Sequence, residues 1–129
     1  MATLDLVERE IVLHIAYFGA LQSGAGSNVR HLHRFLPARD KGEMRREGPK
    51  DRPERVWWFT YAPVDPPKLP GFTLRVRVAS IPSADAIVLD RAPWMEGLDG
   101  VVFVADARAG HGEQNLSALL DLERLLAGQ

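Results

Sequence analysis

Two runs of almost continuous apolar residues stand out along the chain, and each leads through a glycine-containing turn into a segment with helical spacing. Residues Ile11–Phe18 and Gly100–Asp106 are rich in β-branched and aromatic side chains, as is typical of strands buried on both faces of a sheet. Apolar residues then recur at helical spacing in residues 28–36 and 112–128. The second of these segments predicts an amphipathic helix that ends near its last glycine.

Three further elements are predicted between these units. Val56–Tyr61 has strong β-propensity, and Phe72–Ala79 alternates apolar and polar residues, which favours a half-exposed strand paired antiparallel with its predecessor. Ala84–Gly97 predicts an irregular helix interrupted at Pro93. The polar stretch between Pro37 and Arg55 predicts a solvated loop. The resulting order, β-loop-α-β-β-α-β-α, predicts an α/β fold with a four-stranded mixed sheet and about three helices.

Composition narrows the class of protein. The 129 residues are ordinary for one domain, 1–129, and the net charge of −1 gives no electrostatic case for binding nucleic acid or an anionic membrane. No apolar run is long enough to span a bilayer, and Asp5, Glu8 and Glu10 stand where a signal peptide carries positive charge. The chain has no cysteine, which fits a reducing compartment, so we expect a cytoplasmic protein. We expect no metal site, because His31 and His33 face different directions on a helix.

The first loop has the spacing of a phosphate-binding loop without its chemistry. Gly19 and Gly24 have the separation that the pattern G-x-x-x-x-G-K-[ST] requires, between a strand and a helix. Ala25 stands in place of the lysine and Gly26 in place of the metal-binding hydroxyl, while Ser27 follows one position late. Each lost charge-assisted interaction is worth on the order of 1.5–3 kcal/mol, so tight triphosphate binding is not expected. The alternative is a glycine-rich turn that only lets strand and helix pack.

Three segments resemble the small Ras-like GTPases, most closely the bacterial gliding-motility, MglA-type branch. Residues Leu98–Asp106 (LDGVVFVAD) are similar to the family's fourth strand, and Tyr17–Asn28 to its phosphate loop. Residues Gly71–Ala84 are similar to the third strand and the start of switch II. The resemblance extends from about Glu10 to Ala127, and it implies a three-layer Ras-like P-loop fold.

The departures from the family lie at its chemistry. In the switch II run, which here includes Ser80 and Pro82, Ser83 replaces the glycine that meets the γ-phosphate, and Ala84 replaces the glutamine that orients water. The guanine-reading N-K-x-D motif does not follow the last predicted helix. The resemblance therefore implies a truncated pseudo-GTPase without catalytic residues or a nucleotide cofactor. A weak nucleotide or phosphate binder with residual hydrolysis, or a structural subunit of an obligate complex, are the alternatives.

Two groups of apolar residues are candidates for partner binding. Trp57, Trp58 and Phe59 are consecutive, so at least one of them points away from the core, and the resemblance places them on an edge strand. The alternative is that Trp57 and Phe59 belong to the core. In a truncated sheet Val102 and Val104 would lie on an exposed apolar edge, which predicts burial against a second copy or another protein. The resemblance implies a roadblock-like protein as one partner.

Overall fold

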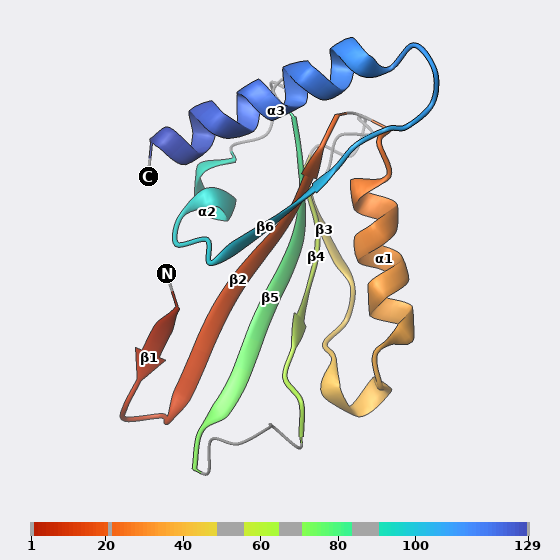
Figure 1. Cartoon of the computed structure of the whole chain (residues 1–129). Helices are drawn as coiled ribbons and strands as arrows, with labels where there is room; N and C mark the ends of the chain where they lie inside the picture. Colours follow the sequence, from red (N-terminus) through yellow and green to blue (C-terminus); the bar gives the residue numbers. More distant parts are fainter. Residues whose placement is uncertain (1, 21, 49–55, 65–70, 84–90, 129) are drawn as a thin grey trace.

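The computed structural model describes residues 2–20, 22–48, 56–64, 71–83 and 91–128, which form a sheet with helices on both sides (Figure 1). Its three helices are α1 (Ala25–Phe35), α2 (Ala92–Met95) and α3 (Gly112–Ala127), and a short 3₁₀ turn, η1 (Ala38–Asp40), follows α1. The described strands are β1 (Thr3–Asp5), β2 (Glu10–Gly19), β3 (Arg45–Glu47), β4 (Val56–Tyr61), β5 (Thr73–Pro82) and β6 (Gly100–Val104).

The strands form one mixed sheet in the order β1-β2-β5-β4-β3, and β6 pairs with β2. The β2–β5 and β2–β6 pairs are parallel, whereas β1–β2, β4–β5 and β3–β4 are antiparallel. The parallel centre and the antiparallel β4–β5 pair confirm the sequence prediction. The prediction of four strands was wrong, because the described residues form six. β1 and β3 have three residues each, too few to produce a hydrophobic period.

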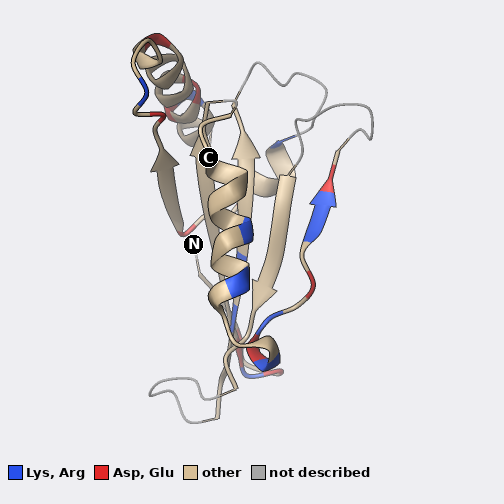
Figure 2. Ribbon diagram, turned by 90° about the vertical axis from the view of Figure 1, so that its right-hand side faces the viewer, with Lys and Arg blue, Asp and Glu red and all other residues tan. Residues whose placement is uncertain are grey.

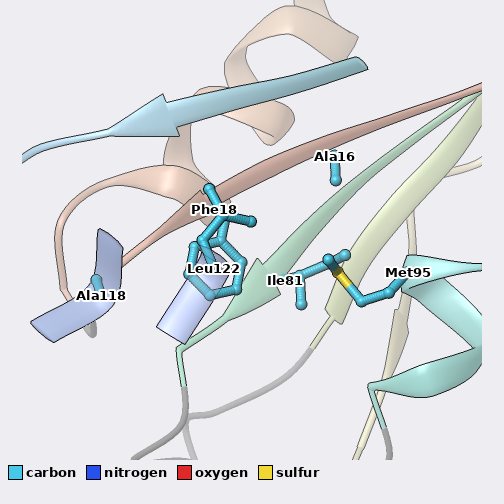
Figure 3. Close-up of a cluster of buried hydrophobic side chains, with 6 residues drawn as sticks. All are labelled: Ala16, Phe18, Ile81, Met95, Ala118 and Leu122. Atoms are coloured by element: carbon cyan, nitrogen blue, oxygen red, sulfur yellow. The ribbon is translucent and has the colours of Figure 1, made fainter. Parts of the chain in front are cut away.

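Alternation along β2 divides the core into two clusters, one on each face of the sheet. Ala16 and Phe18 point to the face covered by α2 and α3, where they meet Ile81, Met95, Ala118 and Leu122 (Figure 3). Tyr17 points to the other face and packs against the cluster formed by Val29 of α1, Phe59 and Val78. The arrangement is therefore helix, sheet, helix, consistent with the Ras-like fold that the resemblance implies.

A buried ion pair joins α2 to α3 and to the end of β5. Arg91 precedes α2, and its Nη1 lies 2.6 Å from Oδ2 of Asp121 on α3. The same nitrogen donates to the carbonyl of Pro82 at 3.2 Å. Both side chains are largely buried, so removing one partner would strand a charge, at a cost of about 3–5 kcal/mol. This pair fixes the chain on both sides of residues 84–90, which lie outside the described part.

Candidate functional site

A cavity of about 390 Å³ lies where β2 turns into α1. Its walls are loop residues 19–20 and 22–27, Arg30 of α1, Trp57 of β4 and residues 80–82 at the end of β5. The fold thus brings the predicted phosphate loop and the first predicted switch II residues, Ser80 and Pro82, to one place. Ser83 is buried beside them, and Ala84 lies outside the described residues.

Two glycines of the loop are required by its geometry. A Cβ atom on Gly19 would lie 2.4 Å from the Ser23 hydroxyl oxygen and 2.4 Å from the Val104 carbonyl oxygen, distances that no side chain tolerates. Gly24 has a φ of 103°, in the left-handed region that favours glycine. The two glycines of the sequence motif therefore shape the loop, whether or not a ligand enters it.

The start of α1 offers backbone N–H groups to the cavity. The N–H groups of a first helical turn have no acceptor within the helix, and among the described residues no side chain caps α1. The first turn also contains no acidic residue. Asn28 donates both its backbone N–H and its Nδ2 to the carbonyl of Gly24, which holds the turn in shape. This geometry suits a small anion.

The Trp57 indole crowds the position at which a residue with a metal-binding hydroxyl would stand. A Cβ atom on Gly26 would lie 3.2 Å from Cδ1 and 3.7 Å from Nε1 of Trp57. A serine or threonine at position 26 would therefore need the indole to move before its hydroxyl could reach a metal ion. No group of three or more His, Asp or Glu side chains comes together as a metal site in the part of the chain that the structure describes.

Arg30 brings the one positive charge among the described residues of the cavity wall. Its Nε donates to the Gly26 carbonyl at 3.3 Å, its Nη2 donates to the Ser27 hydroxyl at 3.2 Å, and its guanidinium carbon lies 4.6 Å from the centre of the Trp57 ring. Sequence reasoning missed this residue, because the motif asks for its cation at position 25. The signal that could have found it is an arginine one helical turn beyond an incomplete phosphate loop.

The amino-acid sequence of the chain is similar to that of a known protein. The chain is 28% identical over all its 129 residues to the mutual gliding-motility protein MglA of Myxococcus xanthus, and it covers 65% of that protein's length. This similarity relates the chain to the small Ras-like GTPases. No protein-family model matches the chain. In the part of the chain that the structure describes, no helix has the length and apolarity that crossing a membrane would take.

Of the two serines in the predicted switch II run, Ser80 has a hydrogen-bond partner in the structure. The Ser80 hydroxyl accepts from the Trp57 backbone N–H at 3.2 Å and lies 3.5 Å from the Trp57 carbonyl, to which it donates. Ser80 therefore reinforces the β4–β5 pair beside the cavity. Ser83 is 6% exposed.

The aromatic residues predicted to bind a partner lie in three different environments. Phe59 is fully buried beneath α1, so its side chain has no surface to offer, and the alternative that it belongs to the core is correct. Trp57 lines the cavity, whereas Trp58 lies on the other face with its ring centre 5.7 Å from that of Trp94. Their strand, β4, is not the edge that the resemblance implied, because β3 pairs with it.

The valines predicted to form an apolar edge lie on β6, which pairs with β2 and with no other described strand. Val102 is 41% exposed and Val104 is half-buried. Leu116 and Leu120 of α3 are exposed as well. Burial of this edge against a partner stays a prediction.

Proposed function

We propose that this Ras-like chain is a protein-binding regulator that neither binds magnesium-GTP tightly nor hydrolyses it. The observation that carries the proposal is the contact between the Trp57 indole and Gly26, 3.2 Å from where a Cβ would stand. In the phosphate loops of nucleotide hydrolases, a serine or threonine at this position binds the magnesium ion. Here the residue has no side chain, and an indole fills the space beside it.

The charges of the cavity support the same proposal. The phosphate-loop lysine, which pairs with the β- and γ-phosphates, is Ala25. Arg30 supplies a cation, but its nitrogens already donate to the Gly26 carbonyl and the Ser27 hydroxyl. The water-positioning glutamine of the family corresponds to Ala84, outside the described residues. Positioning and charge stabilisation are nearly all that an enzyme contributes to phosphoryl transfer, so the loss of these groups removes the basis of catalysis.

A regulatory role is proposed from the relation to MglA, which is named as a gliding-motility protein. A partner would bind at the exposed apolar residues of β6 and α3, and a roadblock-like protein or a second copy of the chain are the candidates. A second candidate function, weak anion binding, is favoured by the uncapped start of α1 beside a cavity of about 390 Å³.

Calorimetry with GTP, GDP and ATP in magnesium tests the proposal. We expect no nucleotide to bind with a Kd below about 10 µM, which corresponds to about −7 kcal/mol. The double variant Ala25→Lys/Gly26→Ser is the matched control: we expect it to gain no tight binding, because the Trp57 indole crowds the side chain added at position 26. Magnesium-dependent binding below that Kd by the unmodified chain, with phosphate release, would overturn the proposal. Weak binding of inorganic pyrophosphate without a need for magnesium would support the second candidate.

A further inference from the structure

The described arginines of this chain differ in whether a carboxylate pairs with them. Arg75, Arg91 and Arg108 are examples of paired arginines, Arg75 with Glu10 at 2.6 Å. Among the arginines that form no ion pair with a described carboxylate, four lie on α1 and β3, and we call them the arginine flank: Arg30 and Arg34 on α1, and Arg45 and Arg46 on β3. All four are exposed.

Two arginines of the flank, Arg30 and Arg46, lie against Trp57, and Arg45 lies against Trp58 on the other face of the sheet. The guanidinium carbon of Arg30 lies 4.6 Å from the centre of the Trp57 ring, and that of Arg46 lies 5.9 Å from it. Arg45 lies 5.7 Å from the ring of Trp58. Figure 2 shows this side of the molecule, with blue bands on α1 and a blue β3 beside it. The two aromatic rings thus lie against three exposed guanidinium groups, of which that of Arg30 also donates to the Gly26 carbonyl and the Ser27 hydroxyl.

The positive charge of α1 is not balanced on the helix itself. Residues 25–35 include no aspartate or glutamate, and Arg30 and Arg34 are four positions apart on one side of the helix. Together with Ser27 and His31 they line a groove of about 260 Å³. Like charges at this spacing repel each other. A bound carboxylate would relieve that repulsion.

We propose that the arginine flank binds an acidic segment of a partner protein, which lies extended beside β3. This proposal goes beyond the proposed function, because β3 lies at the other side of the sheet from β6 and gives a second surface for a partner. β3 ends the strand order of the described sheet, so a segment can add to it through backbone hydrogen bonds. Because Arg45 and Arg46 are adjacent on a strand, they point to opposite faces, and an extended segment with carboxylates on both of its sides meets both.

The same features disfavour nucleic acid as the occupant. A protein that binds single strands stacks bases on open aromatic rings. Two guanidinium groups, from α1 and β3, already approach the Trp57 ring and compete with a base for it. Glu43 and Glu47 also flank the arginines of β3, and the net charge of the chain is −1. Phosphate-dominated binding draws on a stronger excess of positive charge.

Nuclear magnetic resonance on the whole ¹⁵N-labelled chain tests the proposal. The probe is an acetylated eight-residue peptide in which Glu alternates with Val, and the control peptide has Gln at every Glu position. We expect the Glu peptide to shift the amide signals of residues 45–47 and the indole N–H signal of Trp57, with at least tenfold weaker effects from the Gln peptide. The Arg30→Gln/Arg46→Gln variant should bind the Glu peptide at least tenfold more weakly. Arg75→Gln, which removes a paired arginine, should bind it normally.

Three results would overturn the proposal: no shift up to 1 mM Glu peptide, equal binding of the Glu and Gln peptides, or shifts confined to residues outside the arginine flank. Tighter binding of a ten-residue oligothymidine at the same signals would assign the flank to nucleic acid instead. The titration is repeated with magnesium-GTP present. Nucleotide-dependent shifts at residues 22–27 alone would overturn the proposed function and leave the arginine flank standing, so the two failures are distinguishable. Unchanged signals elsewhere in each variant show that it is folded.

Discussion

Two strand-to-helix loops begin side by side in this molecule, because Gly19 at the end of β2 pairs with Val104 at the end of β6. The first leads into α1 and the second into α3. Both follow parallel strands, and both helices begin without a side-chain cap among the described residues. The two loops differ in the groups that fill them. The loop before α1 is open to a ligand, whereas the loop before α3 is filled by side chains of the chain itself.

The second loop, which follows β6, contains a carboxylate that belongs to the chain itself. The carboxylate of Asp106, which is 8% exposed, accepts from the Arg108 backbone N–H at 3.1 Å and from its Nε at 2.9 Å, and His111 Nδ1 lies 3.2 Å away. Asn115 of α3 completes the loop: its Oδ1 accepts the Asp106 N–H and its Nδ2 donates to the Asp106 carbonyl, each at 2.8 Å. The polar groups of Asp106 are therefore satisfied from within the chain.

The first loop has no such filling. Residues 19–24 contain no carboxylate, and the Oγ of Ser23 is buried without a hydrogen-bond partner in the described structure. A cavity remains beside it, with N–H groups at one wall and Arg30 at another. Neighbouring strands of one sheet thus end in two different loops. The loop after β6, which contains Asp106, is closed, and the loop after β2, residues 19–24, is open. Of these two loops, the open one has a cavity that gives an external ligand room.

The largest expected effect comes from Gly19→Ala, which disturbs both loops at once. The new Cβ would meet the Ser23 hydroxyl and the Val104 carbonyl oxygen, both at 2.4 Å, and the second is backbone that cannot turn aside. We expect the free energy of unfolding to fall by about 3 kcal/mol, as for severe overpacking. Urea denaturation followed by circular dichroism measures it.

Gly112→Ala is the matched control, because no heavy atom lies within 4 Å of its added Cβ. At the first position of α3 alanine should change the stability by no more than about 1 kcal/mol. If the two variants unfold at the same urea concentration, the close approach at Gly19 does not hold the two loops together.

A smaller effect is expected from Asn115→Ala, with Asn28→Ala as its counterpart. Each asparagine is the fourth residue of its helix and donates Nδ2 to a carbonyl of the preceding loop. Removing Asn115 also leaves the Asp106 N–H without its acceptor, so we expect a loss of about 2 kcal/mol in thermal or urea unfolding. The side chain of Asn28 is exposed and makes one hydrogen bond, so we expect its removal to lower the free energy of unfolding by about 0.5 kcal/mol. Equal losses would contradict the distinction between a closed and an open loop.

The sequence predicts the course of the backbone around the two loops better than it predicts which side chains fill them. Continuous apolar runs located β2 and β6, and the glycine spacing placed Gly19 and Gly24 at the open loop, because these signals are local. The sequence of β3 is Arg-Arg-Glu, which has no apolar face. β3 is therefore identified as a strand only by its pairing with β4. No local pattern could reveal it.

The contents of the two loops depend on contacts between distant segments. Trp57 reaches Gly26 because β4 pairs with β5 in a register that sets Trp57 opposite Ser80 at the cavity. Asn115 reaches Asp106 across the turn that precedes α3. Spacing along the chain does not fix either contact. The sequence therefore predicts where a site could be, and the register decides which side chains fill it.

The smallest expected effect is a pH-dependent change in Tm, which appears at acid pH and arises in the closed loop. Hydrogen bonds from Arg108 hold the pKa of the Asp106 carboxyl well below its usual range, so the folded state favours the charged form. The stabilisation is fully present above the unfolded pKa of about 3.9 and is lost as the pH falls through the folded pKa. In Asp106→Asn we therefore expect a lowered Tm at pH 7 and a difference from the unmodified chain that shrinks below about pH 4. Arg108→Gln should reproduce part of this pH dependence, since it removes the guanidinium donors and keeps the backbone N–H. A constant difference in Tm across the whole range would show that the charge of Asp106 is not involved. Because residues 19–24 carry no carboxylate, the acid-dependent change belongs to the closed loop, and the open loop should keep its shape through the same titration.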